Sequence, residues 1–360
     1  IGNRITCPKC FDDGHSNEIA IIWRKAKMNN DANHPLMKPY FSSESRAKIA
    51  EEIDEILSTG SLMFGRHTDS LEQGFADLVG VKHAISVNSC TTALTISLRH
   101  FGVAGGEVLV PSGSFVTDIS SILFAEATPV LVDLDPDTLT FDLEDLERKI
   151  TTESRAIVWV HLTGVISAKY KAFLKIAERH DLPVIEDAAH AHGSRMDNKV
   201  AGSIGHVGCF SFYPTKIMTS GTGGMLTTND DELAEFAKEL RIFGKDLKSG
   251  AITRLGNDWF LDEIRACIAY NQLLDLPEML RRRRKVAKTY QDVLANQPGI
   301  HFVDVPENSE PAYYQFAIIL ENGIDVVTLR KRLKSEYRID AKNIYKATHE
   351  EPIFRQFDKG

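Results

Sequence analysis

The sequence contains no long apolar run, so no segment is expected to span a membrane. Its longest apolar stretches, such as Ala156–Val160, are far shorter than the roughly 20 residues that a helix needs to cross a bilayer. The opening residues, IGNRITCPKC, also lack the apolar core of a signal peptide. We therefore expect a cytoplasmic protein without a membrane partner.

Basic clusters are scarce as well. The 42 lysines and arginines are outnumbered by 50 aspartates and glutamates, and the longest basic stretch is Arg281–Lys285. A partner that presents a phosphate backbone needs a larger basic surface than this. No nucleic-acid partner is expected.

Cysteine is rare and scattered. Five cysteines in 360 residues do not make the disulfide framework of a small secreted domain. Cys7 and Cys10 form a single CPKC pair, but a strong zinc site needs a second pair at ribbon spacing. No metal site is predicted, although structural zinc at this pair remains an alternative.

The rest of the composition is that of a folded globular protein. With 43% hydrophobic and 26% charged residues over 360 positions, the chain is too long for one ordinary core, which favours a large and a smaller domain. From residue 83 onward, short β-branched runs alternate with longer runs of helical periodicity. This pattern is typical of parallel strands joined by crossover helices.

Seven segments in this region are predicted to be strands. They are His83–Val87, Glu107–Val110, Pro129–Asp133, Ala156–His161, Pro183–Asp187, Gly208–Tyr213 and Gly224–Thr228. Runs such as VLVDLD are apolar throughout rather than alternating, which indicates a sheet covered on both faces. The expected fold class is α/β, an α/β/α sandwich around a mostly parallel seven-stranded sheet, with ligands at the carboxyl ends of the strands.

The chain is expected to divide into three parts. Residues 1–35 form an extension of unclear role, residues 36–255 the large α/β domain, and residues 256–360 a long linking helix and a small α+β domain. In the last part, Ile300–Val305 and Tyr314–Leu320 are predicted to be strands. Outside the strands, helices are predicted at Ser43–Leu57, Asp69–Leu78, Thr92–His100, Leu143–Ile150, Tyr170–His180, Asp231–Phe243, Asp262–Ala295 and Val326–Glu336.

Three strand ends carry residues suited to chemistry. In CFSFYPTKIMTSGTGG, Lys216 follows a buried strand; a lysine there is usually a solvated surface charge. Asp187 ends the apolar strand VIED, where a carboxylate needs a cationic partner or many hydrogen bonds. After the strand AISVNS, residues 90–92 open a helix whose N–H groups and hydroxyls can bind an anion.

These three features match the needs of one cofactor. Pyridoxal 5′-phosphate (PLP) requires a phosphate anchor, a carboxylate that keeps its ring nitrogen protonated, and a lysine amine for a Schiff base. The three strand ends offer one group of each kind. We therefore expect PLP as the cofactor.

From about Lys38 to Phe357 the sequence resembles the DegT/DnrJ/EryC1/StrS family of fold-type I, PLP-dependent sugar aminotransferases. Five phrases in the family's order carry the resemblance: VNSCTTAL (87–94), PVLVDLD (129–135), EDAAHAHG (186–193), AGSIGHVGCFSFYPTK (201–216) and GTGGMLTTND (221–230). Relatives continue for some tens of residues past the position that matches Gly360. The small C-terminal domain could therefore lack its last elements.

The resemblance implies a role for each catalytic residue. Lys216 would form the Schiff base with PLP and then move the substrate proton as base and acid in turn. Asp187 would pair with the pyridinium nitrogen. His190 would approach the cofactor's 3-oxygen, a capped loop histidine being the alternative. Phe115 would stack on the ring.

The resemblance also implies a phosphate site completed by a second subunit. Four residues of one chain would contribute to it: Cys90, Thr91, Thr92 and Ser211. In relatives the neighbouring subunit adds an asparagine, so a homodimer with shared active sites is implied. Here the phrase reads GNDWFLDE (256–263), which places Asp258 at that position in an ungapped alignment. A carboxylate about 4 Å from a phosphate is repelled by more than about 1 kcal/mol, so Asn257 is the favoured residue.

The implied function is transfer of an amino group from an amino acid, glutamate foremost, to a keto sugar, usually nucleotide-linked in this family. The alternatives are a keto-cyclitol aminotransferase, a sugar dehydratase, and a non-catalytic PLP-binding regulatory protein. The dehydratases carry histidine where this chain has Lys216. Phe260, where many relatives have arginine, departs from the family in a substrate-facing region. The run Arg281–Lys285 either binds an extended anionic acceptor or is a solvated helix face.

Overall fold

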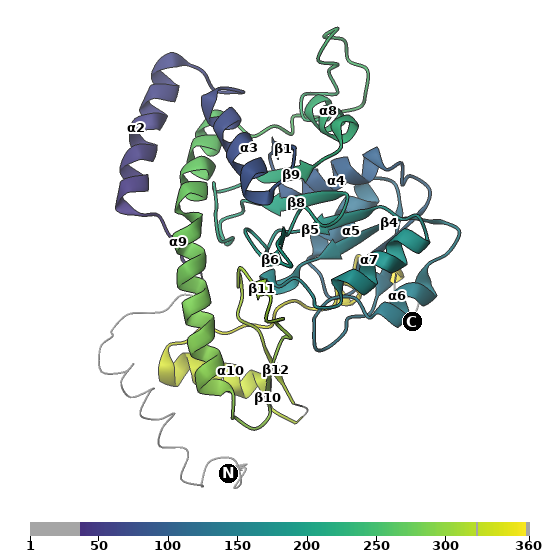
Figure 1. Ribbon diagram of the computed structural model, residues 1–360, viewed down its shortest axis with the longest axis vertical. Helices are drawn as coiled ribbons and strands as arrows, with labels where there is room; N and C mark the ends of the chain where they lie inside the picture. Colours follow the sequence, from purple (N-terminus) through teal and green to yellow (C-terminus); the bar gives the residue numbers. More distant parts are fainter. Residues whose placement is uncertain (1–36, 322, 358–360) are drawn as a thin grey trace. The chain divides into compact units, whose positions relative to one another are not determined.

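The computed structural model describes residues 37–321 and 323–357 (Figure 1). The predicted extension and its CPKC pair lie outside the described residues. The described chain forms two compact units. The larger comprises residues 39–288, 302–318 and 344–357, and the smaller comprises 37–38, 289–301, 319–321 and 323–343. The domain boundary expected between residues 255 and 256 stays a prediction.

The helices are α2 (Ser43–Thr59), α3 (Arg66–Val79), α4 (Cys90–His100), α5 (Val116–Phe124), α6 (Leu143–Lys149), α7 (Tyr170–Arg179), α8 (Asp231–Leu240), α9 (Glu263–Leu294) and α10 (Val326–Tyr337). Short 3₁₀ turns occur at Leu162–Gly164, Thr348–Glu350 and Arg355–Phe357. No helix among residues 37–321 and 323–357 combines the length and apolar character needed to cross a bilayer.

The strands are β1 (His83–Val87), β2 (Glu107–Pro111), β3 (Thr128–Val132), β4 (Ser154–Val160), β5 (Val184–Asp187), β6 (Arg195–Met196), β7 (Lys199–Val200), β8 (Val207–Ser211), β9 (Gly224–Thr228), β10 (Ile300–Phe302), β11 (Ser309–Glu310) and β12 (Ile318–Leu320). The sheet at the centre of the larger unit has seven strands in the order β1-β9-β8-β5-β4-β2-β3 (Figure 1). Only β9 runs antiparallel to its neighbours in it. The predicted mostly parallel α/β sandwich is confirmed.

Successive residues of a strand point to opposite faces of this sheet, and both faces are covered. In β4, Ile157 and Trp159 belong to one buried cluster, which includes side chains of α3, α7 and α9. Ala156 and Val158 belong to the other, which includes side chains of α4, α5 and α8. Because both faces are dry, the strand sequence is apolar at every position.

Side-chain caps fix where several helices begin. The hydroxyl of Ser89 accepts a hydrogen bond from the N–H of Thr92 at the start of α4 (3.1 Å), and Asp230 caps α8 in the same way. Helix α3 has no such cap in its own segment. There, Glu263 accepts hydrogen bonds from the N–H groups of Gly65 (2.8 Å) and Thr68 (2.9 Å).

The C-terminal strands are shorter than predicted. The segment expected over Tyr314–Leu320 is a strand only in β12, and the one expected over Ile300–Val305 only in β10. Tyr313 has a positive φ of 47°, which turns the backbone out of the extended conformation. Arg283 of α9 then binds the carbonyl oxygens of Tyr313 (3.0 Å) and Tyr314 (3.3 Å), so a side chain satisfies these groups in place of a neighbouring strand.

The smaller unit contains α10 and the loops around it. Asp325 caps α10 through the N–H groups of Val327 and Thr328. Arg338 ends the helix with a left-handed conformation, φ 57°, and Arg330 donates to the carbonyl of Ala341 (2.9 Å). No residue of α10 is buried.

Candidate active site

Three of the residues predicted to bind or use the cofactor follow strands that end at one edge of the central sheet. Strands β1, β8 and β5 run in the same direction, because β9 is antiparallel to both β1 and β8, while β8 and β5 are parallel. Their carboxyl ends lead to Cys90, Lys216 and Asp187, respectively. This edge is where ligands bind in open α/β sheets.

Asp187 is the last residue of β5 and is only 7% exposed. Its Oδ1 accepts a hydrogen bond from the N–H of Ala189 (2.9 Å) and lies 3.7 Å from the Sγ of Cys90. Burial, and then the charge of Asp187, raises the pKa of the Cys90 thiol. The thiol is therefore a neutral neighbour of the carboxylate rather than a nucleophile.

The start of α4 presents main-chain donors toward this edge. Ser89 uses its carbonyl for the N–H of Ala93 (3.2 Å) and its hydroxyl for that of Thr92. The N–H groups of Cys90 and Thr91 have no acceptor among the described residues. A Cβ at Gly224 of β9 would lie 2.6 Å from the Cys90 nitrogen. Only glycine therefore allows β9 to lie this close to the start of α4.

The predicted hydroxyls differ in what they already bind. Thr92 donates its hydroxyl to Asn88 (2.7 Å), and its N–H is the one capped by Ser89. Ser211, at the end of β8, accepts from the N–H of Tyr213 (3.3 Å). The side chain of Thr91 makes no hydrogen bond within the described chain. The geometry therefore favours Thr91 and the N–H of Cys90 over Thr92 as donors to a phosphate.

Lys216 lies in the loop after β8, where its N–H donates to the carbonyl of Tyr213 (2.9 Å). Its Nζ stands over the ring of Tyr314, 4.8 Å from the centroid. The hydroxyls of Tyr314 and Thr215 are 2.9 Å apart, which fixes that ring. The charge of Lys216 lowers the pKa of Cys90, although burial and Asp187 outweigh it, so the amine acts on the same cluster as Asp187.

His190 is buried against two tyrosines. Its ring stacks on Tyr314, with centroids 4.2 Å apart and planes at 29°, and its Nε2 is 3.0 Å from the hydroxyl of Tyr345. Gly164, at φ +90°, passes so close that a Cβ there would lie 2.4 Å from the His190 carbonyl oxygen. The side chain is thus held in an aromatic stack.

Phe115 precedes α5 as its N-cap residue and is 46% exposed. Its ring centroid is 5.5 Å from that of Tyr345, with planes at 46°. Tyr345 therefore links Phe115 to His190. The sequence did not indicate Tyr314 or Tyr345, because neither follows a predicted strand end or lies in a glycine-rich phrase.

Asn257 lies in a separate loop of the same chain. Its main-chain N–H donates to the carbonyl of Leu240 (3.2 Å), and its side-chain Oδ1 accepts from the N–H of Asp258 (2.8 Å). The described contacts do not join it to Lys216 or Asp187. The prediction that Asn257 acts from a second copy of the chain remains a prediction.

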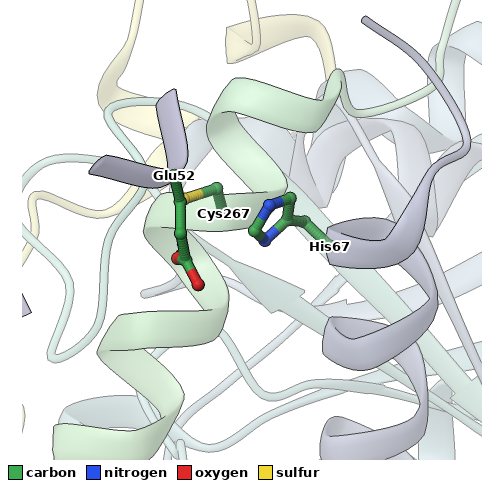
Figure 2. Close-up of side chains that lie close together, drawn as sticks. All are labelled: Glu52, His67 and Cys267. Atoms are coloured by element: carbon green, nitrogen blue, oxygen red, sulfur yellow. The ribbon is translucent and has the colours of Figure 1, made fainter. Parts of the chain in front are cut away.

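A cluster away from this edge joins three helices. Glu52 of α2, His67 of α3 and Cys267 of α9 bring potential metal-ligand atoms within 4.8 Å of one another (Figure 2). The Cys267 thiol donates to Glu52 (3.3 Å), and Arg66 donates to the His67 ring (3.3 Å). Burial, and then the hydrogen bond to Glu52, raises the pKa of Cys267 to about 12. The cluster is held together by hydrogen bonds between the helices. A cation that bound there through Cys267 would have to displace the thiol proton.

The sheet-edge residues fit PLP. Two main-chain N–H groups without an acceptor suit its phosphate, a nearly buried carboxylate suits its ring nitrogen, and a lysine amine lies in the same cluster. The sequence profile of the DegT/DnrJ/EryC1/StrS aminotransferase family matches residues 43–360. This chain belongs to that family. It is a PLP-dependent aminotransferase.

Characterised relatives resemble this aminotransferase over most of its length. The GDP-perosamine synthase of Caulobacter vibrioides is 42% identical over 71% of this chain and 69% of its own. The dTDP-3-amino-3,4,6-trideoxy-alpha-D-glucose transaminase of Micromonospora megalomicea is 31% identical over 82% and 79%. The crystal structure of S. venezuelae DesV with a ketimine intermediate superposes with a TM-score of 0.81 at 33% identity, covering 87% of this chain and 84% of DesV.

Proposed function

We propose that this aminotransferase moves an amino group from an amino acid, glutamate foremost, to a keto sugar carried on a nucleotide. The observation that carries the proposal is that Lys216, Asp187 and the unbonded N–H groups of α4 meet at one sheet edge. Two relatives whose names give nucleotide-sugar products, GDP-perosamine and a dTDP-amino sugar, support the choice of acceptor. The cytoplasm stays the expected compartment.

Each residue of the site has a distinct task in this proposal. When bound, PLP supplies a carbonyl that takes up the amino group and a ring that accepts electrons from the reacting carbon. The Lys216 amine attaches the cofactor, and its Nζ holds and moves the proton of that carbon. The Asp187 carboxylate keeps the ring nitrogen protonated. Phe115 and His190 orient the ring.

Arg283, an arginine near the site, already uses one of its nitrogen groups within the chain. An α-carboxylate is commonly bound by a guanidinium through two parallel hydrogen bonds. Arg283 is close enough for its charge to lower the pKa of His192, after burial and Lys216, but its NH1 group binds the carbonyls of Tyr313 and Tyr314. The NH1 group of Arg283 is therefore committed within the chain, and the choice of a keto-sugar acceptor rests on the named relatives.

Other arginines of the basic run Arg281–Lys285 also form ion pairs and hydrogen bonds within the chain. Arg281 and Arg282 both bind Glu278. Arg284 binds Glu310 and the carbonyl of Pro311. These contacts leave little support for an acceptor-binding role of the run.

A second copy of the chain completes the site in this proposal. Leu62 and Met63 are 50% and 47% exposed, and Leu255 is 83% exposed. The carbonyl of Leu62 accepts from the N–H of Glu263 (3.0 Å), so exposed apolar side chains lie beside the 256–262 loop. Exposed apolar side chains gathered around one loop are typical of an interface between subunits.

Within that loop, Asn257 is better suited to a phosphate than Asp258. Its Oδ1 is used by the N–H of Asp258, which leaves the side-chain NH₂ without an acceptor among the described residues. An ionised aspartate only accepts hydrogen bonds. We propose that the partner subunit's Asn257 donates to the cofactor phosphate.

The test is a comparison of acceptors. The purified enzyme is first aminated with glutamate, and its return to the starting absorbance is then timed with nucleotide-linked keto sugars, keto-cyclitols, pyruvate and oxaloacetate. A keto sugar should react at least about tenfold faster than the simple keto acids, about 1.4 kcal/mol in transition-state binding. If only simple keto acids react, the sugar proposal fails while the aminotransferase assignment stands.

A further inference from the structure

Asp118 is a buried acid that no role described so far uses. It lies in the first turn of α5, three residues after Phe115, and has no exposed surface. Neither carboxylate oxygen makes a hydrogen bond of good geometry among the described residues, although the hydroxyl of Ser114 lies close enough to act on Asp118. Buried polar groups are nearly always hydrogen-bonded, and an ionised carboxylate without donors is strongly disfavoured.

The neighbour that matters is Asp187. The two carboxyl groups are within hydrogen-bonding reach of each other. Two carboxylates cannot form such a bond, because neither carries a proton to donate. One proton between them forms the bond and removes the repulsion of two like charges.

The other groups around Asp118 do not supply that proton or a full counter-charge. Cys90 of α4 and Cys209 of β8 are buried thiols whose pKa values are raised, chiefly by burial. Burial also raises the pKa of the Tyr345 hydroxyl. The hydroxyl of Ser114 faces Asp118 and lowers its pKa, but the contact falls short of good hydrogen-bond geometry.

The electrostatics agree with the geometry. Burial, and then the charge of Asp187, raises the pKa of Asp118 well above its ordinary value. Ser114 and the charge of Lys216 act in the opposite direction but do not offset the rise. Burial and the charge of Asp187 therefore both favour the protonated form of Asp118.

We infer that Asp118 is protonated and donates a hydrogen bond to the Asp187 carboxylate, which makes Asp118 a positioning residue for the group that faces the cofactor nitrogen. The inference rests on the proposed role of Asp187. The pair carries one negative charge, which matches the one positive charge of a protonated ring. A hydrogen bond donated by Asp118 also makes the Asp187 carboxylate less basic. The second proton, between Asp187 and the cofactor, therefore stays on the ring nitrogen.

Infrared spectroscopy of the apoprotein tests the proton directly. A protonated carboxylic acid absorbs separately from carboxylates, and this band should be present in the wild type at neutral pH and missing in Asp118→Asn. The control is Asp145→Asn. Asp145 is also buried, but it accepts hydrogen bonds from the N–H of Asp133 (2.8 Å) and from Arg148, and lies 3.1 Å from the Lys149 ammonium. The control should leave the band unchanged.

The positioning role is tested with cofactor labelled at its ring nitrogen. In Asp118→Asn the amide still donates to Asp187, so the ¹⁵N signal should remain that of a pyridinium and PLP affinity should stay within about twofold. In Asp118→Leu the donor is lost, so the signal should move toward the unprotonated ring and PLP affinity should fall about tenfold, as expected for a hydrogen bond to a charged group.

Two results would overturn the inference. One is an apoprotein spectrum without the acid band, and the other is an Asp118→Leu protein that matches the wild type in both ¹⁵N signal and affinity. If the leucine variant does not fold, the infrared comparison with Asp118→Asn still decides whether Asp118 is protonated. A protein that keeps the band but transfers no amino group would contradict the proposed function and not the proton on Asp118.

Discussion

The pH dependence of stability should contain a large contribution from His192. This side chain has no exposed surface, and its ring packs against Phe75, Phe210 and Phe212 at centroid distances of 6.5, 5.5 and 6.1 Å. Neither ring nitrogen makes a hydrogen bond of good geometry within the described chain. Burial, and then the charge of Lys216, lowers the pKa of His192 from 6.5 to about 3.

The direction in which stability changes with pH follows from the number of protons that the folded and unfolded chains bind. Between pH 6.5 and about 3, the unfolded chain binds a proton at His192 that the folded chain does not bind. The contribution is therefore fully present above pH 6.5 and is lost as the pH falls toward 3. At about 1.4 kcal/mol per pH unit, the loss reaches about 3 kcal/mol by about pH 4.5 and about 5 kcal/mol at its limit.

Replacement of His192 by phenylalanine isolates this contribution, because the ring stays and the titration is removed. We expect urea unfolding of the apoprotein to show a stability difference, His192→Phe minus wild type, that grows by about 3 kcal/mol from neutral pH to about pH 4.5. His180→Phe, at an exposed position on the end of α7, is the control and should show a much smaller change. Parallel pH curves for wild type and His192→Phe would refute the reasoning.

Four further results are expected. Lys216→Ala should fold normally but lose both the cofactor absorbance and amino transfer, and a borohydride-reducible adduct in this variant would contradict that. Asp187→Asn should bind PLP yet transfer amino groups more slowly, and turnover at the wild-type rate would contradict that. Asn257→Ala should weaken PLP binding more than Asp258→Ala in titrations of the apoprotein, and the reverse order would show that the ungapped register is right. Glu263→Gln should lower the free energy of unfolding by about 1–3 kcal/mol, because several N–H groups at the start of α3 lose a charged acceptor; an unchanged urea midpoint would contradict this.

The sheet was predictable because its strands obey a local rule. A strand buried on both faces must be apolar at every position, and such runs are visible in the sequence at β4 and β5. The same rule places chemistry at strand ends, which is why Asp187 and Lys216 could be named in advance. Five phrases, two of them around Lys216, added the resemblance to the family.

Helix α5 was not predictable by such a rule. Its sequence, VTDISSILF, is rich in β-branched and hydroxyl residues, which have low helix propensity. Packing decides its conformation, since Ile119 and Ile122 have no exposed surface and belong to the cluster that also contains side chains of α4. The hydroxyl of Ser121 donates to the carbonyl of Thr117 (2.7 Å), so this polar side chain is satisfied within the helix.

The aromatic side of the site was missed for a related reason. Tyr314 and Tyr345 come from segments far along the chain from His190, and nothing local marks them. Only the fold brings them to the sheet edge. Asp118 was missed because aspartates are mostly exposed, and only its burial in the structure shows otherwise.

The charges at the sheet edge explain why one chain is not expected to suffice. With Asp118, Cys90 and Cys209 neutral, the cluster holds the negative charge of Asp187 and the positive charge of Lys216. A phosphate brings about two negative charges at neutral pH, and a protonated ring offsets one of them. At the start of α4 the described chain offers this phosphate main-chain N–H groups and hydroxyls. These donors bind an anion without neutralising it, so further donors from a second copy should strengthen cofactor binding. PLP affinity should therefore fall when the protein is diluted below its dimer dissociation constant. Sedimentation combined with cofactor titration measures both quantities on one sample, and an active monomer with undiminished PLP affinity would show that one chain binds the phosphate alone.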